Sequence, residues 1–215
     1  MNNPTTFYIV RHGESEANVG FRDGTIKTYS GSLAHGTDLT EKGISQAKER
    51  AKDLQNIKFD AAFSSDFTRA KRTAEIIAKE HELVVESLKI LRERFWGSLE
   101  GWPIEKIDSE MKRLQEGLNA QQKMKFKLVE DAESNEEAAV RMVQFVREMA
   151  LAYPDKTVLV VSHGDIMRRF LTKIGYVEYE ELPAHSVKNT AYFVLKSDGI
   201  EFEVIKTEGI EKKTS

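Results

Sequence analysis

The sequence predicts an α/β fold of three layers, in which helices flank a mostly parallel β-sheet. Two stretches, FYIVRHGES (Phe7–Ser15) and VLVVSHGDI (Val158–Ile166), begin with apolar runs of the kind that form strands buried on both faces. Each run leads through a polar residue into His-Gly and then into an acidic start to a helical segment. Strand candidates alternate with helical periodicity along the rest of the chain, which is typical of successive βα units.

The elements of the first half follow from this alternation. A polar loop, residues 19–37, comes after the first strand, and Asp38–Glu41 opens a helix. The inward face of this helix carries Ile44, Ala47, Ala51 and Leu54. Phe59–Ser65 is predicted to form the second strand, and Ser65 or Asp66 to cap the helix that follows. That helix turns Ala70, Ala74, Ile77 and Ala78 inward.

The second half predicts a short strand within Leu83–Leu91, helical pieces over residues 102–133, and then a long helix. Ser134 and Glu137 have the spacing of a capping box, and the helix ends near Tyr153–Pro154. The residues expected to pack beneath it are Val140, Val143, Val146, Met149 and Ala150. The helix after the Val158 strand carries Ile166, Phe170 and Ile174 inward. A hairpin that turns through Ser197–Gly199 closes the fold, and the charged residues from about Lys206 are expected to fray.

Length, charge and cysteine content limit the kinds of protein that this chain can be. A chain of 215 residues is long enough for one α/β domain, and we expect residues 1–215 to form a single domain. The net charge of −3 gives no reason to expect a nucleic-acid partner. The absence of cysteine excludes disulfides and thiolate catalysis and favours a cytoplasmic location. The first residues do not resemble a signal peptide, and no apolar run reaches the length of a membrane span. Nothing in the sequence specifies an oligomeric state.

Two histidines are expected to meet in one crevice. Ligands bind beyond the carboxyl ends of strands in open parallel sheets, and His12 and His163 both follow such strands. A metal site is the obvious alternative, but the permanent charge of Arg11 would repel a cation, and the sequence has no H-x-H or H-E-x-x-H spacing. A guanidinium beside imidazole suits an anion, above all a phosphate. We therefore predict a phosphate site with no metal and no cofactor.

Four ordered blocks carry a resemblance to a known family. RHGESEAN (Arg11–Asn18), SSDFTRAKRTAE (Ser64–Glu75), LRERFWGSLEG (Leu91–Gly101) and VSHG (Val161–Gly164) resemble the motifs of the histidine phosphatase superfamily, also called phosphoglycerate mutase-like. The blocks stand in the family's order and span nearly the whole chain. The resemblance implies a mostly parallel sheet flanked by helices, in agreement with the elements predicted above.

The resemblance also implies residue roles. His12 matches the family nucleophile, which forms a phosphohistidine, and Arg11 and Arg69 match the phosphate-binding arginines. His163 matches a second histidine that donates to a phosphoryl oxygen, with the Gly164 N–H beside it. Asn18 matches an asparagine that contacts the same phosphate. Ser30 and Gly31 resemble a short element that contacts substrate, although the segment from Asn18 to Leu39 is longer than is usual in the family.

Glu93 is the candidate proton donor. The leaving alkoxide needs a proton and the second step needs a base, and one carboxyl group can serve both roles in turn. Glu14 and Asp165 are the rival acids, but near a helix N-terminus each is explained as a stabilising first-turn carboxylate. We expect Arg92 and Arg94 to point away from the site and Trp96 to help exclude water from it. The remaining histidines are interpreted as surface residues: His35, His81 and His185.

The leading functional hypothesis is a metal-independent phosphomonoesterase acting on small phosphorylated metabolites such as sugar or glycerate phosphates. The alternative is a bisphosphoglycerate-dependent phosphoglycerate mutase. Mutases of the family carry a long insertion whose basic residues hold the substrate carboxylate, and here only Lys106, Lys112 and Arg113 lie in that region, where they are typical of a solvated helix face. A phosphate-binding relative without catalytic activity and a metal-dependent hydrolase are two further hypotheses. Residues 19–37 and 102–133 are expected to form the pocket rim.

Overall fold

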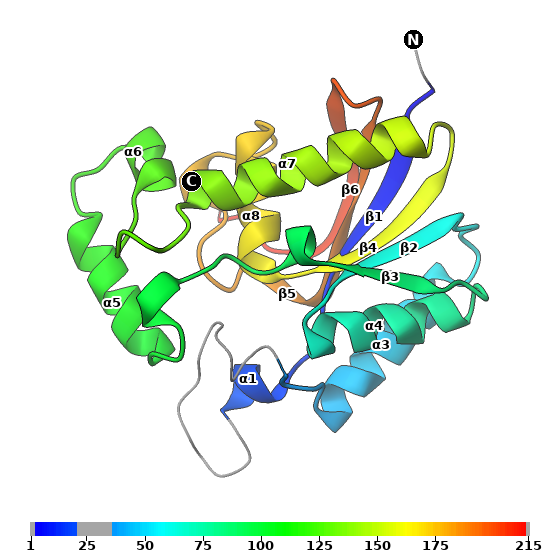
Figure 1. Cartoon of the computed structure of the whole chain (residues 1–215), viewed down its shortest axis with the longest axis horizontal. Helices are drawn as coiled ribbons and strands as arrows, with labels where there is room; N and C mark the ends of the chain where they lie inside the picture. The colour runs from blue at the N-terminus through cyan, green and yellow to red at the C-terminus, as the bar shows by residue number, and fades with distance from the viewer. Residues whose placement is uncertain (1–2, 21–35, 214–215) are drawn as a thin grey trace.

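The computed structural model describes residues 3–20 and 36–213, and these form an α/β fold around one six-stranded sheet (Figure 1). The strands follow the order β3-β2-β4-β1-β5-β6 across the sheet. Their bounds are β1 (Thr5–Arg11), β2 (Ala61–Ser65), β3 (Val85–Leu88), β4 (Thr157–Ser162), β5 (Val187–Ser197) and β6 (Phe202–Ile210). The first four are mutually parallel, whereas β5 runs antiparallel to β1 and β6 antiparallel to β5. The predicted fold class is confirmed.

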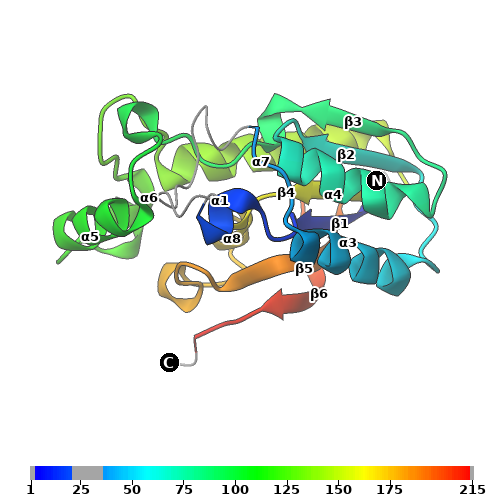
Figure 2. The ribbon, with the colours of Figure 1, turned by 90° about the horizontal axis from the view of Figure 1, so that it is seen from below.

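Helices cover both faces of this sheet, which makes the three predicted layers (Figures 1 and 2). On one face lie α3 (Glu41–Leu54) and α4 (Thr68–Lys79), and on the other lie α7 (Asn135–Ala152) and α8 (Gly164–Lys173). A short α1 (Glu16–Val19) follows β1. Two smaller helices, α5 (Ile104–Leu114) and α6 (Ala120–Lys125), lie to one side of the sheet. Short 3-10 turns occupy Lys89–Leu91, Gly97–Leu99 and Tyr179–Glu181.

Alternating side chains of the central strands fill two separate cores. Phe7 and Ile9 of β1 face α7 and α8, whereas Val10 faces α3 and α4. The same alternation holds in β4, where Val158 and Val160 belong to the first core and Leu159 and Val161 to the second. Strands buried in this way have little freedom to slip, because a shift of one residue would exchange the two sets of side chains. The carboxyl ends of β1 and β4 are therefore fixed relative to each other.

Two expectations about the helices need correction. The helix α4 begins after Phe67, and neither Ser65 nor Asp66 caps it, because the Asp66 carboxylate pairs with Arg92 and the Ser65 hydroxyl is hydrogen-bonded to His163. In α7 the capping box of Ser134 and Glu137 is present as predicted, but Val140 is 46% exposed. The other four predicted residues do face the core: Val146 and Ala150 are fully buried, and Val143 and Met149 pack against it. Met142 and Phe145, which were not predicted, are buried with them.

The chain end was expected to fray from Lys206, and this is wrong for the residues that the structure describes. Strand β6 continues to Ile210. Beyond it, the Glu211 N–H donates to the Ser186 carbonyl at 2.9 Å, and the Lys213 N–H to the Glu181 carbonyl at 2.8 Å. These backbone hydrogen bonds order the chain end, and the charged composition of the segment gives no sign of them. Among the described helices, none combines the length and the apolar character that crossing a membrane requires.

Candidate active site

The parallel pairing of β1 and β4 brings His12 and His163 together. Arg11 lies opposite Ser162 in the ladder, and the His12 N–H donates to the Ser162 carbonyl at 3.0 Å. The two imidazole rings follow directly, with their centroids 5.1 Å apart, and only 3% of His12 and none of His163 is exposed. His163 precedes the first residue of α8 in extended backbone, so its ring lies where that helix begins. The crevice with two histidines that the sequence predicts is present.

Hydrogen bonds define the tautomer of His12. Its Nδ1 lies 2.7 Å from the carbonyl oxygen of Gly13. Because a carbonyl can only accept, Nδ1 carries the proton and Nε2 keeps its lone pair. The guanidinium of Arg69 donates through Nε to this Nε2 at 3.3 Å. The ring is thus oriented with a basic nitrogen facing the Arg69 guanidinium.

His163 adopts the opposite tautomer. Arg69 Nη2 lies 3.3 Å from His163 Nδ1, and since guanidinium is a donor only, Nδ1 must accept. The proton therefore sits on Nε2, which donates to the Ser65 hydroxyl at 2.9 Å. The Phe67 ring packs against this imidazole, with centroids 5.2 Å apart. One arginine, Arg69, therefore binds both histidines.

Burial and neighbouring cations keep both imidazoles neutral. Desolvation is the largest cause that holds the pKa of His12 well below its usual value near 6.5, followed by the charges of Arg69 and Arg11. Desolvation and the same arginines also hold the pKa of His163 well below that value. Burial lowers the pKa of Arg69 to about 10, so this guanidinium is still charged at neutral pH. The site thus combines neutral imidazole with buried positive charge, an environment that favours an anion.

Two glycines allow the backbone and Arg11 to approach the site. A Cβ atom on Gly164 would lie 3.2 Å from Arg11 Nε, and a Cβ atom on Gly13 would lie 2.6 Å from the Gly43 carbonyl oxygen. Arg11 itself donates through Nη1 to the Val187 carbonyl at 2.5 Å, which ties its guanidinium to β5. A side chain larger than hydrogen at Gly164 would crowd Arg11, and one at Gly13 would push the His12 loop away from α3.

Glu93 lies in the loop after the 3-10 turn at Lys89–Leu91, and its carboxylate contacts the N-terminus of α8. Its Oε2 accepts from the Asp165 N–H at 3.1 Å, and its Oε1 from the Ile166 N–H at 2.9 Å. The Arg94 N–H donates to Oε1 as well, at 3.0 Å. Backbone donors at a helix N-terminus thus hold the carboxylate in place. Its charge also acts on Arg69, whose pKa it raises against the effect of burial.

The rival acids Glu14 and Asp165 are held in their charged forms. Burial opposes ionisation of Glu14, but hydrogen bonds from Lys42 and Thr40 lower its pKa overall. Burial likewise opposes ionisation of Asp165, yet Arg94, Arg168 and Arg169 hold the pKa of this carboxyl well below its usual range. A carboxylate that stays ionised has no proton to give. Neither Glu14 nor Asp165 is therefore suited to the role of proton donor.

Sequence reasoning missed Asn189, which joins two site residues. Its Nδ2 donates to the His12 carbonyl at 3.2 Å and to Asn18 Oδ1 at 3.3 Å. Asn18 Oδ1 also accepts from the Ser15 N–H at 3.1 Å, so the amide nitrogen of Asn18 faces away from these donors. The Thr190 N–H donates to the same His12 carbonyl at 3.3 Å. Asn189 lies near the start of β5, and nothing in its sequence spacing marks it as a site residue.

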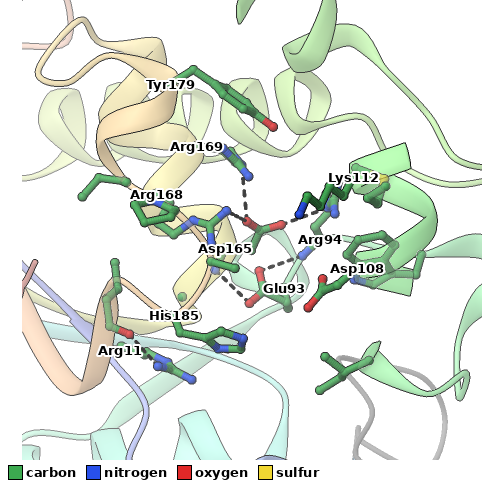
Figure 3. Close-up of a pocket in the computed structure, with 18 of the residues that line it drawn as sticks. Arg11, Glu93, Arg94, Asp108, Lys112, Asp165, Arg168, Arg169, Tyr179 and His185 are labelled. Atoms are coloured by element: carbon green, nitrogen blue, oxygen red, sulfur yellow. Dashed lines mark hydrogen bonds and ion pairs between the residues drawn. The ribbon is translucent and has the colours of Figure 1, made fainter. Parts of the chain in front are cut away.

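A pocket of about 1230 Å³ opens over these residues (Figure 3). It is lined by Arg11, His12, Asn18, Arg69, Glu93 and Gly164. The opposite side is lined by residues of α5 and by Lys123 of α6, so the predicted rim at 102–133 is confirmed in part. Ser30, Gly31 and His35 lie outside the described residues. Lys106, Lys112 and Arg113 are exposed, as predicted, although the latter two also line the pocket. Trp96 is buried and lines it too.

Three expectations about neighbouring residues are wrong or incomplete. Arg94 does not point away from the site, because it lines the pocket and is only 4% exposed. His185 is exposed, as expected of a surface residue, but it also lines the pocket. His81 is half-buried, and its ring packs edge-on against Phe59 with centroids 4.8 Å apart. In the described part of the chain, no three His, Asp or Glu side chains are grouped so that they could hold a metal ion.

The chain is similar to known phosphatases and phosphoglycerate mutases. The family model described as the histidine phosphatase superfamily (branch 1) matches residues 7–208. The phosphatase PhoE of Bacillus subtilis is 30% identical over 173 residues, which cover 80% of this chain and 78% of PhoE. A 2,3-bisphosphoglycerate-dependent phosphoglycerate mutase of Bartonella bacilliformis is 28% identical, with 82% of this chain and 84% of the mutase covered. The structure of Bacillus stearothermophilus YhfR is 24% identical with a TM-score of 0.77, covering 95% and 96% of the two chains.

The geometry predicts opposite tautomers for the two histidines. In a two-dimensional ¹H–¹⁵N correlation spectrum of the folded protein, His12 should carry its proton on Nδ1 and His163 on Nε2, because a carbonyl faces the first and a guanidinium the second. Since both pKa values lie well below 6.5, both rings should remain neutral as the pH falls through 6.5. Protonation of His12 at or above pH 6.5 would contradict the prediction.

Proposed function

The chain belongs to the histidine phosphatase superfamily, and we propose that it is a metal-independent phosphomonoesterase that forms a phosphohistidine on His12 and transfers the phosphoryl group to water. The observation that carries this proposal is the neutral His12 ring, whose Nδ1–H bonds to Gly13 and whose Nε2 lone pair faces the buried Arg69 guanidinium. A nucleophile of this kind attacks phosphorus most readily when cations have already neutralised the phosphoryl oxygens. The expected substrates are small phosphorylated metabolites such as sugar or glycerate phosphates.

In the first step the phosphoryl group lies between Arg11, Arg69 and the amide nitrogen of Asn18. His12 Nε2 forms a bond to phosphorus while the bond from phosphorus to the ester oxygen breaks. Glu93, protonated at this point, gives its proton to the departing oxygen. The guanidinium groups stabilise the charge that spreads over the three equatorial oxygens, and the fold holds both arginines beside the histidines before substrate binds.

In the second step water replaces the alcohol. The Glu93 carboxylate accepts a proton from this water as its oxygen attacks phosphorus, and the bond to His12 Nε2 breaks. The products are inorganic phosphate and neutral His12, so the site returns to its starting state. One carboxyl group thus acts first as acid and then as base, which splits one difficult displacement into two easier ones.

His163 takes part through its contact with Arg69. In the empty site the positive charge of Arg69 lowers the pKa of His163, after the larger effect of burial. A phosphoryl dianion would draw the Arg69 N–H groups toward itself and reverse the sign of the nearby charge. His163 Nδ1 would then be able to hold a proton and donate it to a phosphoryl oxygen. This account gives the second histidine the role of a donor that charges only when substrate is bound.

The phosphoglycerate mutase reaction shares the first step and differs in the acceptor. Its phosphoryl group returns to a retained bisphosphoglycerate instead of passing to water. The Bartonella relative is named as such a mutase, at an identity close to that of the Bacillus subtilis phosphatase. Against it stands the segment between Glu93 and His163, which holds only the short α5 and α6 ahead of α7. The two reactions are separated by whether phosphate appears in solution.

The first test is phosphate release from p-nitrophenyl phosphate in an excess of chelator. Wild-type protein should retain its activity, because the proposed nucleophile and electrostatic groups are side chains. His12→Ala should reduce turnover by at least about 100-fold with no loss of folding, since the ring makes no core contact that the strand end requires. His81→Gln, outside the pocket, is the matched control and should stay active. Activity that chelator removes, or that His12→Ala retains, would contradict the proposal.

A second test separates the role of Glu93 from general damage to the site. Glu93→Gln should slow hydrolysis of alkyl phosphates by about 100-fold or more, because their alkoxides need a proton as they leave. Hydrolysis of p-nitrophenyl phosphate should fall by less than about tenfold, because nitrophenolate departs without a proton. The measurement is kcat/KM on both classes of ester for the same protein preparation. Equal losses on both would remove Glu93 as the acid.

A further inference from the structure

Three arginines share a single carboxylate, that of Asp165, in the pocket (Figure 3). Asp165 Oδ2 lies 3.0 Å from Arg94 Nε, and its Oδ1 lies 3.0 Å from Arg168 Nη2 and 3.3 Å from Arg169 Nε. All four residues line the pocket. None of the three guanidinium groups is needed by the reaction steps derived above. The proposed reaction therefore does not account for this cluster of arginines.

The cluster is buried and carries more positive charge than Asp165 can balance. Arg94 is 4% exposed, and Arg168 and Arg169 are each 7% exposed. One carboxylate offsets one of the three cations, and uncompensated buried charge is costly. Burial and then repulsion by Arg169 lower the pKa of Arg168 to about 10, so it is still charged at neutral pH. In the described part of the chain, Arg168 Nε is buried without a hydrogen-bond partner.

Aromatic rings hold two of these guanidinium groups in place. The Arg94 guanidinium lies 3.7 Å from the centre of the Trp96 ring, and that of Arg169 lies 4.4 Å from the centre of the Tyr179 ring. Such contacts stabilise a cation and leave its N–H groups available around the edge of the guanidinium plane. A guanidinium offers five donors, so three of them offer far more than the few acceptor positions of one carboxylate. The guanidinium N–H groups that Asp165 cannot pair with are suited to bind a second anion.

The position of the cluster identifies which part of a substrate would reach it. Glu93 accepts hydrogen bonds from the backbone of Asp165 and Ile166, so it stands beside the first turn that carries the cluster. In Figure 3, Glu93 lies beside Asp165 and Arg94, and Arg169 lies on the far side of the Asp165 carboxylate. If Glu93 protonates the departing oxygen, the alcohol extends past Glu93 and toward Arg168 and Arg169.

We infer that Arg94, Arg168 and Arg169 form a second anion site, which binds a carboxylate or a second phosphate on the alcohol portion of the substrate. This inference rests on the proposed function, because Glu93 defines the leaving-group side. It narrows the substrate class from phosphate esters in general to esters whose alcohol is itself acidic. Neutral sugar and glycerol phosphates would fill the phosphoryl site but leave these three cations without a partner from the ligand.

The test compares esters that differ only in the second anion. 3-Phosphoglycerate and sn-glycerol 3-phosphate differ by a carboxylate, and fructose 1,6-bisphosphate and fructose 6-phosphate differ by a phosphate. Binding is measured by calorimetry on His12→Ala, which cannot turn over the ester, and kcat/KM is measured on the wild-type protein. In at least one pair the member that carries the second anionic group should be preferred by about tenfold or more in both measurements, the effect of one or two charge-assisted hydrogen bonds. A preference within the first pair would identify a carboxylate as the second anion, and a preference within the second pair would identify a phosphate.

Variants connect the preference to the cluster. Arg169→Gln keeps two arginines beside Asp165 and should reduce the preference ratio about tenfold. Arg147→Gln removes the same charge from the exposed surface of α7, outside the pocket, and should leave the ratio unchanged. Equal binding and equal hydrolysis of both members of each pair would overturn the second anion site while supporting the phosphatase. A binding preference without any hydrolysis, even of p-nitrophenyl phosphate, would support the site and contradict the phosphatase. A preference that Arg169→Gln retains would also overturn the inference.

Discussion

Because β1 and β4 pair in parallel, with Arg11 opposite Ser162, their carboxyl ends deliver two imidazoles and a guanidinium to one edge of the sheet. The next strand supports this arrangement. Where the pairing of β5 with β6 shifts register, Asn189 and Thr190 donate to the His12 carbonyl. Thr190 adopts a φ of 56°, a backbone conformation that costs about 1–3 kcal/mol in a residue other than glycine. Arg50 Nε binds the Thr190 carbonyl at 3.0 Å and helps hold this strained residue in place.

The electrostatics of the site depend on the same burial. A solvated histidine would be partly protonated near neutral pH, and a protonated ring has no lone pair with which to attack phosphorus. Here desolvation and the two guanidinium groups both favour neutral imidazole. The Arg69 guanidinium remains charged and therefore attracts the phosphoryl dianion toward the lone pair of His12. The same buried positive charge thus keeps His12 neutral and attracts the phosphoryl group.

Much of the fold and of the site could be predicted from the sequence because it depends on local patterns. The apolar runs at Phe7 and Val158, the capping box at Ser134 and the two His-Gly pairs are each short and characteristic. Arg94 could not be placed, since the chain around it is an irregular turn, where alternation does not apply, and its partner Asp165 is distant in sequence. Asn189 was missed for a related reason, because its role depends on a register shift between β5 and β6 that no composition signal reveals.

The central claim is that phosphoryl transfer passes through His12 Nε2. The most direct measurement is mass spectrometry of the protein after rapid mixing with substrate and an alkaline quench, which preserves phosphohistidine. The account predicts one added phosphoryl group, located on the peptide that contains His12 and absent from the peptide that contains His163. A phosphoryl group on His163, or steady phosphate release with no labelled histidine at any quench time, would contradict it.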